Sequence, residues 1–215
     1  MGGIDLLRTL KFLPGIILGL TVHEFCHAYV AYKCGDSTAR EQGRISMNPL
    51  KHIDPLGFIL LLVAGFGWAK PVEFNEKNLK HPRIDILKIA VAGPLANALT
   101  AMLLSVTFVI WMRSGTFSYT GTKTFLYEIL QYGIFINWGL FIFNMIPIPP
   151  LDGSHLLLSL FRKYPEVHNT LYRYGSFLLF AIIIASAFSK YNFLPIGTLI
   201  NYFADGFMSM LGYRI

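Results

Sequence analysis

An apolar segment near the start of the chain constrains the fold more than any other feature of the sequence. Residues 12–32 contain no Lys, Arg or Asp, and their one carboxylate is Glu24. As a helix this segment would be about 31 Å long, and the hydrocarbon core of a bilayer is about 30 Å thick. The sequence therefore predicts a transmembrane helix over Phe12–Tyr32.

The composition agrees with a membrane protein. Hydrophobic residues make up 54% of the 215 residues and charged residues 14%, whereas a soluble domain carries about 25% charged residues. The net charge of +6 is no sign of a nucleic-acid partner, because no basic stripe with interleaved aromatic residues is present. The basic residues lie between the apolar segments, as the positive-inside rule describes.

The remaining apolar segments predict an all-α polytopic membrane protein with about five transmembrane helices and a re-entrant element. The later spans are expected at about Ile86–Trp111, Phe125–Phe143, Phe177–Phe188 and Phe193–Leu211. Leu56–Ala64 is shorter than the roughly 20 residues that a span needs, and a glycine-rich GFGW follows it. We therefore expect a re-entrant element with β-hairpin character over Leu56–Val72, where protein or a water-filled cavity satisfies its backbone.

The five residues His23-Glu24-Phe25-Cys26-His27 lie inside the first predicted span. Two histidines four positions apart share one face of a helix, with Cβ atoms about 5–6 Å apart. They can bind one zinc ion together, with the glutamate as general base of a hydrolytic reaction. Such a string also arises by chance, and a buried histidine is often only a core residue. At bilayer depth, however, an ionisable group without a task is costly, which favours the metal-dependent interpretation.

A catalytic zinc ion normally has a third protein ligand and one open position. The candidates are Asp152 and four histidines near span ends or in polar loops, His52, His81, His155 and His168. Three prolines between residues 147 and 150 end the third span just before Asp152, because proline cannot continue a helix. By itself PPLDG is also an ordinary loop turn.

The distribution of Lys and Arg gives a topology that bears on this choice. If Leu56–Val72 does not cross the membrane, one side carries Lys33, Arg40, Arg44, Lys51, Lys70, Lys77, Lys80, Arg83, Lys88, Arg162, Lys163, Arg173 and Arg214. The other side carries Arg8, Lys11, Arg113, Lys123 and Lys190. The positive-inside rule places the larger set in the cytoplasm. His27 and Asp152 then lie toward the same cytoplasmic face, which favours Asp152 as the third ligand.

Three motifs occur in a fixed order, HEFCH at 23–27, AGPLAN at 92–97 and NMIPIPPLDG at 144–153. With these motifs and with HAYVAYKCGD, GRISMNPLKHIDP and GFGWAKPV, the chain resembles the site-2 protease family of intramembrane zinc metalloproteases. It is similar to the compact bacterial branch that lacks PDZ and CBS domains, over about residues 12–160. Gly153-Ser154 stands where many members have two glycines.

The resemblance implies one zinc ion per chain and a role for each motif residue. The implied zinc ligands are His23, His27 and Asp152, with Glu24 activating the water and Asn144 assisting substrate or oxyanion binding. The motif residues Gly93, Pro94 and Asn97 are expected to pack the core spans. We expect one metalloprotease domain over residues 1–215, with a catalytic core at about 12–160 and C-terminal helices at about 172–212.

The resemblance also implies the substrate and the location. The substrate would be a transmembrane protein, such as an anti-sigma factor or a membrane-bound regulator, cut within or near its span. The segment Gly65–Val72, with Gly65, Phe66, Gly67 and Trp68 as its candidate contact residues, is expected to bind it as an added strand, although a structural turn with Trp68 at the membrane interface is an equal alternative. The protein is expected in a bacterial cell membrane with its active site toward the cytoplasm.

Two other functions compete with proteolysis. Two histidines and one carboxylate can also hold non-haem iron in an oxygenase. A membrane transporter or binding protein could use the same residues for metal transit. Glu24 beside the first histidine favours hydrolysis, and the other spans offer few polar residues for a second path.

Overall fold

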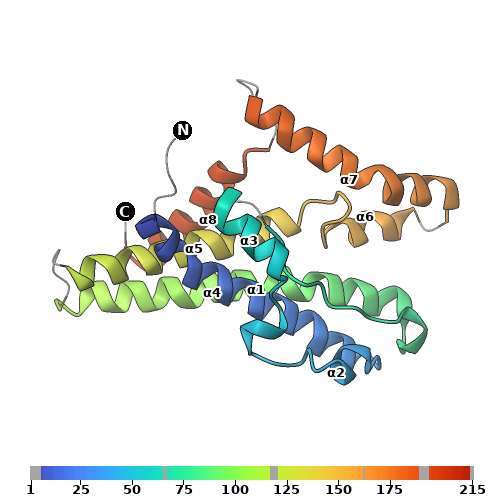
Figure 1. Ribbon diagram of the computed structural model, residues 1–215, viewed down its shortest axis with the longest axis horizontal. Coiled ribbons are helices and arrows are strands. Elements are labelled where there is room, and N and C mark those ends of the chain that lie inside the picture. Colours follow the sequence, from blue (N-terminus) through green and yellow to red (C-terminus); the bar gives the residue numbers. More distant parts are fainter. Residues whose placement is uncertain (1–5, 65–66, 117–120, 162, 189–193, 214–215) are drawn as a thin grey trace.

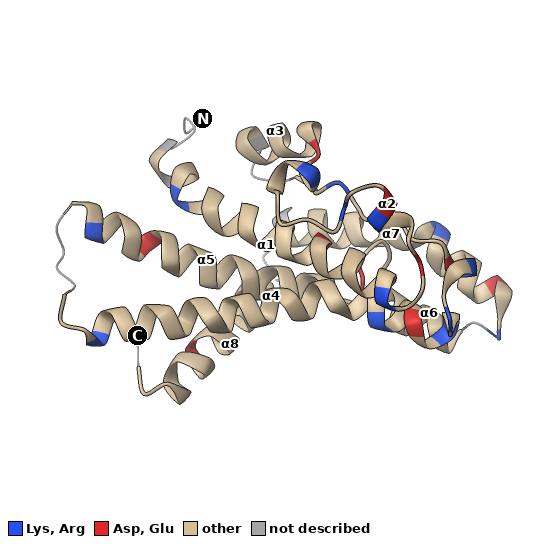
Figure 2. Ribbon diagram, turned by 90° about the horizontal axis from the view of Figure 1, so that it is seen from below, with Lys and Arg blue, Asp and Glu red and all other residues tan. Residues whose placement is uncertain are grey.

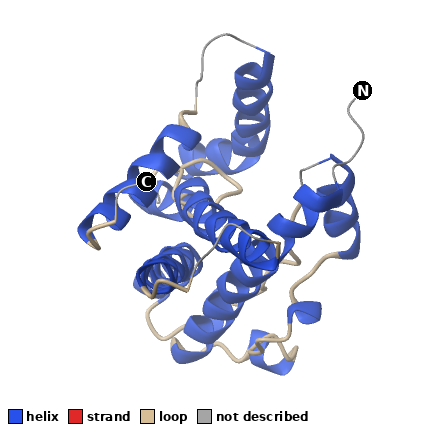
Figure 3. Cartoon of the chain, turned by 90° about the vertical axis from the view of Figure 1, so that its left-hand side faces the viewer, coloured by secondary structure: helices blue, strands red, loops and turns tan. Residues whose placement is uncertain are grey.

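The computed structural model describes residues 6–64, 67–116, 121–161, 163–188 and 194–213. Over these residues the protein contains helices and no β-strands (Figure 3). The α-helices are α1 (Leu6–Lys33), α2 (Thr38–Glu41), α3 (Pro55–Ala64), α4 (Pro82–Arg113), α5 (Thr122–Asn144), α6 (Ser154–Leu160), α7 (Pro165–Phe188) and α8 (Ile196–Met210). Two short 3-10 helices are η1 (Pro49–Lys51) and η2 (Glu76–Asn78).

The centre of the molecule is a bundle of the three long helices α1, α4 and α5, which pack against one another (Figure 1). Each contains a segment long and apolar enough to cross a membrane, namely Thr9–Lys33, Pro82–Arg113 and Thr122–Asn144. The first three predicted spans are therefore present as helices, and α4 begins four residues earlier than predicted. Pro82 suits the first helical position, and the Asp85 carboxylate accepts the free backbone N–H of His81 at 2.7 Å.

The C-terminal part differs from the expectation of two further spans. Within the described residues, three helices are long and apolar enough to span a membrane, and α7 and α8 are not among them. The first half of α7 is polar, and Pro195 precedes an α8 of only 15 residues. Helix α8 packs on α4 and α5 through Met208, Phe108 and Trp138, whereas α7 stands away from the bundle (Figure 1). The structure thus supports three candidate spans and does not confirm five.

The expected β-hairpin over Leu56–Val72 is not present in the described part of this segment. The segment begins as helix α3, because Pro55 starts it and the Asp54 carboxylate caps it by accepting the Gly57 N–H at 2.8 Å. On the other side of α3, one antiparallel bridge joins Ala69 to Ile53, which lies two residues before the helix. A Cβ on Gly57 would overlap the carbonyl of Trp68. Residues 67–74, called the return segment below, therefore begin directly against α3. Gly65 and Phe66 lie outside the described residues.

Helices α1 and α5 approach closely at glycines that the sequence analysis did not single out. A Cβ on Gly15 would lie 2.8 Å from the Cα of Gly133, and a Cβ on Gly19 would lie 2.7 Å from a methyl group of Leu140. Gly15 and Gly19 form a small-xxx-small pair, the pattern with which membrane helices bring their backbones together. This contact places α5, and the turn that follows it, beside the motif helix.

The buried Asp36 carboxylate ties together the loops that flank the bundle. It accepts hydrogen bonds from the backbone and hydroxyl of Thr38, at 3.2 and 2.7 Å, and from the Asn75 backbone and the Asn78 amide, both at 2.8 Å. The loop after α1 is thereby joined to the loop before α4. Charged residues gather at this end of the molecule, around α2 and α6, and few lie at the opposite end (Figure 2).

Candidate metal centre

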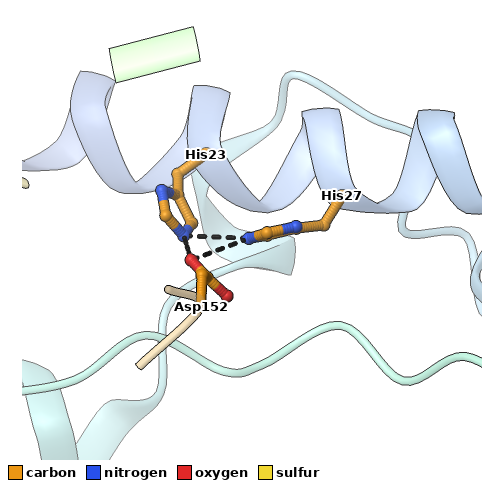
Figure 4. A group of neighbouring side chains, drawn as sticks. All are labelled: His23, His27 and Asp152. Carbon is orange, nitrogen blue, oxygen red and sulfur yellow. Dashed lines mark hydrogen bonds and ion pairs between the residues drawn. The ribbon is translucent and has the colours of Figure 1, made fainter. Parts of the chain in front are cut away.

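Helix α1 presents the two motif histidines on one face. His23 and His27 are one helical turn apart, are both buried, and point toward the same space below the helix (Figure 4). Their Nε2 atoms are 3.0 Å apart, and their rings are nearly perpendicular, at 78°. The helical spacing therefore produces the convergence of two imidazole nitrogens that the sequence predicted.

Asp152 reaches the same space from the turn that follows α5. The Gly153 N–H donates to the carbonyl of Asn144, the last residue of α5, at 2.7 Å. A Cβ on Gly153 would lie 2.7 Å from the carbonyl oxygen of Ile146, so this tight turn requires glycine. The turn places Asp152 Oδ2 at 3.1 Å from Nε2 of His23 and 3.4 Å from Nε2 of His27.

The hydrogen bonds behind the two rings determine where their protons lie. Nδ1 of His27 is 2.7 Å from the carbonyl oxygen of Ile89, which can only accept, so this nitrogen carries the proton. Nδ1 of His23 is 2.7 Å from the amide oxygen of Asn97, which imposes the same tautomer. Both Nε2 atoms therefore direct unshared electron pairs at each other and at Asp152.

This arrangement fits a bound cation. Two nitrogen lone pairs and a carboxylate oxygen within 3.0–3.4 Å of one another repel when no proton or cation lies between them. Asp152 Oδ2 is buried and has no hydrogen-bond donor among the described residues. Two neutral imidazoles and one carboxylate form a ligand set that suits zinc and other first-row metals.

Gly93 leaves room for such an ion. A Cβ at this position would lie 2.7 Å from Nε2 of His23 and still closer to Nε2 of His27. The absence of a side chain on this face of α4 therefore keeps the space between the two ligand nitrogens open. The motif at residues 92–97 thus contributes more than helix packing, because Gly93 borders the candidate metal site and Asn97 accepts a hydrogen bond from one of its histidines.

Glu24 lies beside this group without belonging to it. Its carboxylate is buried, and Oε2 accepts the backbone N–H of Val72 at 2.9 Å. The Arg44 guanidinium is 3.9 Å from the same oxygen and also donates to the carbonyl of Lys70. The return segment after α3 therefore contacts the glutamate directly and holds its carboxylate in place.

The three candidate ligands and Glu24 line one open cleft of about 260 Å³. Its other walls include Asn144, His155 and the return segment at Pro71, Val72 and Phe74. Asn144 uses one amide N–H for the carbonyl of Leu140 in its own helix, at 3.0 Å. Its predicted role toward the substrate thus remains a prediction.

Gly67 and Trp68, two of the residues expected to bind the substrate, do not line the cleft. They line a separate, apolar pocket of about 130 Å³ against α3.

His155 lines both the cleft and an adjoining cavity of about 280 Å³. Burial lowers the pKa of His155, so the neutral imidazole is favoured. Its position three residues after Asp152 was the one signal that could have placed it there.

Comparison with known proteins relates the chain to one family of peptidases. The profile of peptidase family M50 matches residues 11–184. YwhC of Bacillus subtilis, named as a candidate zinc metalloprotease, is 37% identical over 180 residues, which cover 84% of this chain and 82% of YwhC. Rip2 of Mycolicibacterium smegmatis, with the same description, is 26% identical over 84% of this chain and 69% of its own. No solved structure matches the chain.

Proposed function

The chain belongs to peptidase family M50, the site-2 protease family, and on that premise we propose that it is an intramembrane zinc metalloprotease. The proposed reaction is hydrolysis of a peptide bond within or near a transmembrane segment of another membrane protein. Three candidate spans surround the site, in keeping with a membrane-embedded enzyme.

The observation that carries the proposal is the convergence of two imidazole nitrogens and the Asp152 carboxylate on one buried point, with the Glu24 carboxylate in the same cleft. His23, His27 and Asp152 form the one group of potential metal ligands found among the described residues. We propose that they hold one zinc ion per chain. The tautomers of both histidines, set by acceptors behind the rings, support this assignment, because a histidine ligand needs an unprotonated nitrogen toward the metal.

The chemistry follows from the positions of the remaining groups. Bound zinc would supply Lewis acidity, which polarises the scissile carbonyl and lowers the pKa of the attacking water. Glu24 lies in the same cleft and would take the proton from that water and return it to the leaving amine. The free amide N–H of Asn144 would donate to the carbonyl oxygen as negative charge develops there.

We further propose an orientation with the metal centre toward the cytoplasm of a bacterial cell. The excess of Lys and Arg on the loops that share a side with Asp152 supports it. Exposed apolar side chains on the second half of α7, including Phe177, Phe180 and Ile184, suit contact with lipid. We propose that α7 and α8 complete the membrane part, and that the substrate is a membrane-bound regulator of the anti-sigma-factor kind.

The test is a comparison of purified wild type with Glu24→Gln in detergent, using a panel of single-span substrates. The amide oxygen of glutamine can still accept the Val72 N–H, so the variant should fold and keep about one zinc ion per chain. Cleavage should fall by about 10²–10⁴, the usual contribution of a general base. Glu128→Gln, an equivalent change at the partly exposed ion pair with Lys11, serves as the matched control.

Each outcome of this comparison has a defined meaning. Zinc in all three proteins with cleavage lost only in Glu24→Gln supports the proposal. Wild-type cleavage by Glu24→Gln would overturn the role of the glutamate. Iron in place of zinc would favour the oxygenase alternative, and a metal that the protein moves across vesicles without cleaving any substrate would favour transport.

A further inference from the structure

Two fully buried asparagines form a hydrogen-bonded chain that ends at the metal-binding group. Asn97 lies on α4 and Asn137 on α5, and neither has any exposed surface. The Asn97 side chain donates to Asn137 Oδ1 at 3.1 Å, and its own oxygen faces His23 at 2.7 Å. Polar side chains this deep in a membrane bundle are costly even when they are paired with each other, so the presence of two asparagines here needs an explanation.

The direction of every hydrogen bond in this chain follows from its outer end. Asn137 Nδ2 donates to two backbone carbonyls, Gly133 O at 2.8 Å and Gly15 O at 3.4 Å. Its Oδ1 therefore faces Asn97 and can only accept. Asn97 must present its amide group to that oxygen and to the Gly19 carbonyl, at 2.9 Å. Its own oxygen is then directed at Nδ1 of His23.

The consequence reaches the metal site. If the Asn97 amide were reversed, its oxygen would face two acceptors, Asn137 Oδ1 and Gly19 O, and its N–H groups would face His23. A proton on Nδ1 of His23 would then lose its acceptor, and the ring would favour the tautomer with its proton on Nε2. That tautomer has no lone pair on Nε2, the nitrogen that faces the proposed metal. Groups that orient metal-binding histidines typically change metal affinity 10–100-fold.

We propose that Asn137 is a positioning residue, which acts through Asn97 to hold His23 in its metal-binding tautomer and orientation. This inference rests on the proposed metal centre. Among the described residues, Asn137 forms hydrogen bonds with Asn97, Gly133 and Gly15, and with none of the three candidate ligands or Glu24. The competing explanation is that Asn137 only joins α1 to α5, where Gly15 and Gly133 also meet.

The experiment measures zinc affinity by chelator competition and the visible spectrum of the cobalt-substituted protein. The first variant is Asn137→Ser, whose hydroxyl can bond to the Gly133 carbonyl within its own helix but is too short to reach Asn97. The second is Asn137→Leu, which fills a similar volume without a polar atom. Gly133→Ala keeps the Gly133 carbonyl and places a Cβ 3.1 Å from a methyl group of Leu104 on α4 and 4.0 Å from the Cα of Gly15. It is the matched control for packing. Thermal unfolding of the metal-free proteins monitors stability.

We expect both Asn137 variants to bind zinc about tenfold more weakly than wild type and to show an altered cobalt spectrum. Gly133→Ala should keep wild-type affinity and spectrum even where its melting temperature falls. Asn97→Ala should weaken binding as well. In that background Asn137→Ser should cause no further loss, because the path to His23 is already cut.

Three results would overturn the inference. They are wild-type zinc affinity in a folded Asn137 variant, an affinity loss that Gly133→Ala reproduces at equal stability, and additive losses in the double variant. Failure of the wild-type protein itself to bind zinc would instead overturn the proposed function. The two failures are therefore distinguishable.

Discussion

Replacing Gly93 by alanine gives a quantitative test of the metal centre. The new Cβ would lie 2.7 Å from Nε2 of His23 and closer still to Nε2 of His27, whereas carbon atoms normally stay about 3.5–4.0 Å from such neighbours. The rings or α4 must therefore shift by about 0.8 Å or more. Functional groups generally need to be held within about 0.5 Å of their working geometry, so the ligand set should be disrupted.

The size of the effect can be bounded from this geometry. A change behind a ligand costs 10–100-fold in metal affinity, and Gly93→Ala displaces the ligands themselves. We therefore expect a loss of more than about 100-fold, or about 2.8 kcal/mol at 1.4 kcal/mol per tenfold. The metal-free protein should lose only the 1–3 kcal/mol that is typical of about one inserted methyl group in a packed core.

The assay is zinc affinity by chelator competition, with cleavage of a single-span substrate as the second measurement. Gly206→Ala is the matched control, because a Cβ there would meet no atom within 4 Å. It should bind zinc and cleave as wild type does. Wild-type zinc affinity in Gly93→Ala would refute the placement of the metal between the two Nε2 atoms, whatever its effect on stability.

Two further predictions concern the loops that flank the bundle. Asp36→Asn removes a buried carboxylate with four hydrogen bonds and should cost about 2 kcal/mol of unfolding free energy, measured by thermal unfolding, whereas the exposed Asp205→Asn should cost nothing measurable. An unchanged melting temperature would contradict the role of Asp36. Burial lowers the pKa of His52 below its ordinary 6.5. Its stabilising contribution is thus fully present above pH 6.5 and is lost as the pH falls from there toward the folded-state pKa. The melting temperature of wild type should drop over this range more than that of His52→Gln, and parallel curves would contradict the buried neutral histidine.

Much of the site could be predicted because its main signals are local. The four-residue spacing of His23 and His27 places both rings on one face of any helix, and the apolar length around them predicts a membrane span. The prolines before Asp152 end α5 whatever lies around them. The prediction that Asp152 meets the two histidines depended on more than local sequence. It used the membrane topology and the family resemblance.

The parts that were missed depend on contacts between distant segments. The β-hairpin expectation was based on a short apolar run and glycines, but a capping aspartate and Pro55 start a helix there. The structure places Gly67 and Trp68 against α3, while Val72, five residues after Gly67, contacts Glu24. No periodicity in the sequence distinguishes these two positions, because both lie in one irregular segment.

The sequence by itself determined the three apolar helices of the bundle, the pair of histidines with the glutamate between them, and the turn that carries Asp152. These follow from hydrophobic length, helical period and proline, which act over a few residues. Only the tertiary structure decided that Gly93 opens the space between the histidines, and that Asn97 and Asn137 form a hydrogen-bonded chain that ends at His23. The physical reason is that hydrogen-bond direction and close packing exist only after α1, α4 and α5 have met.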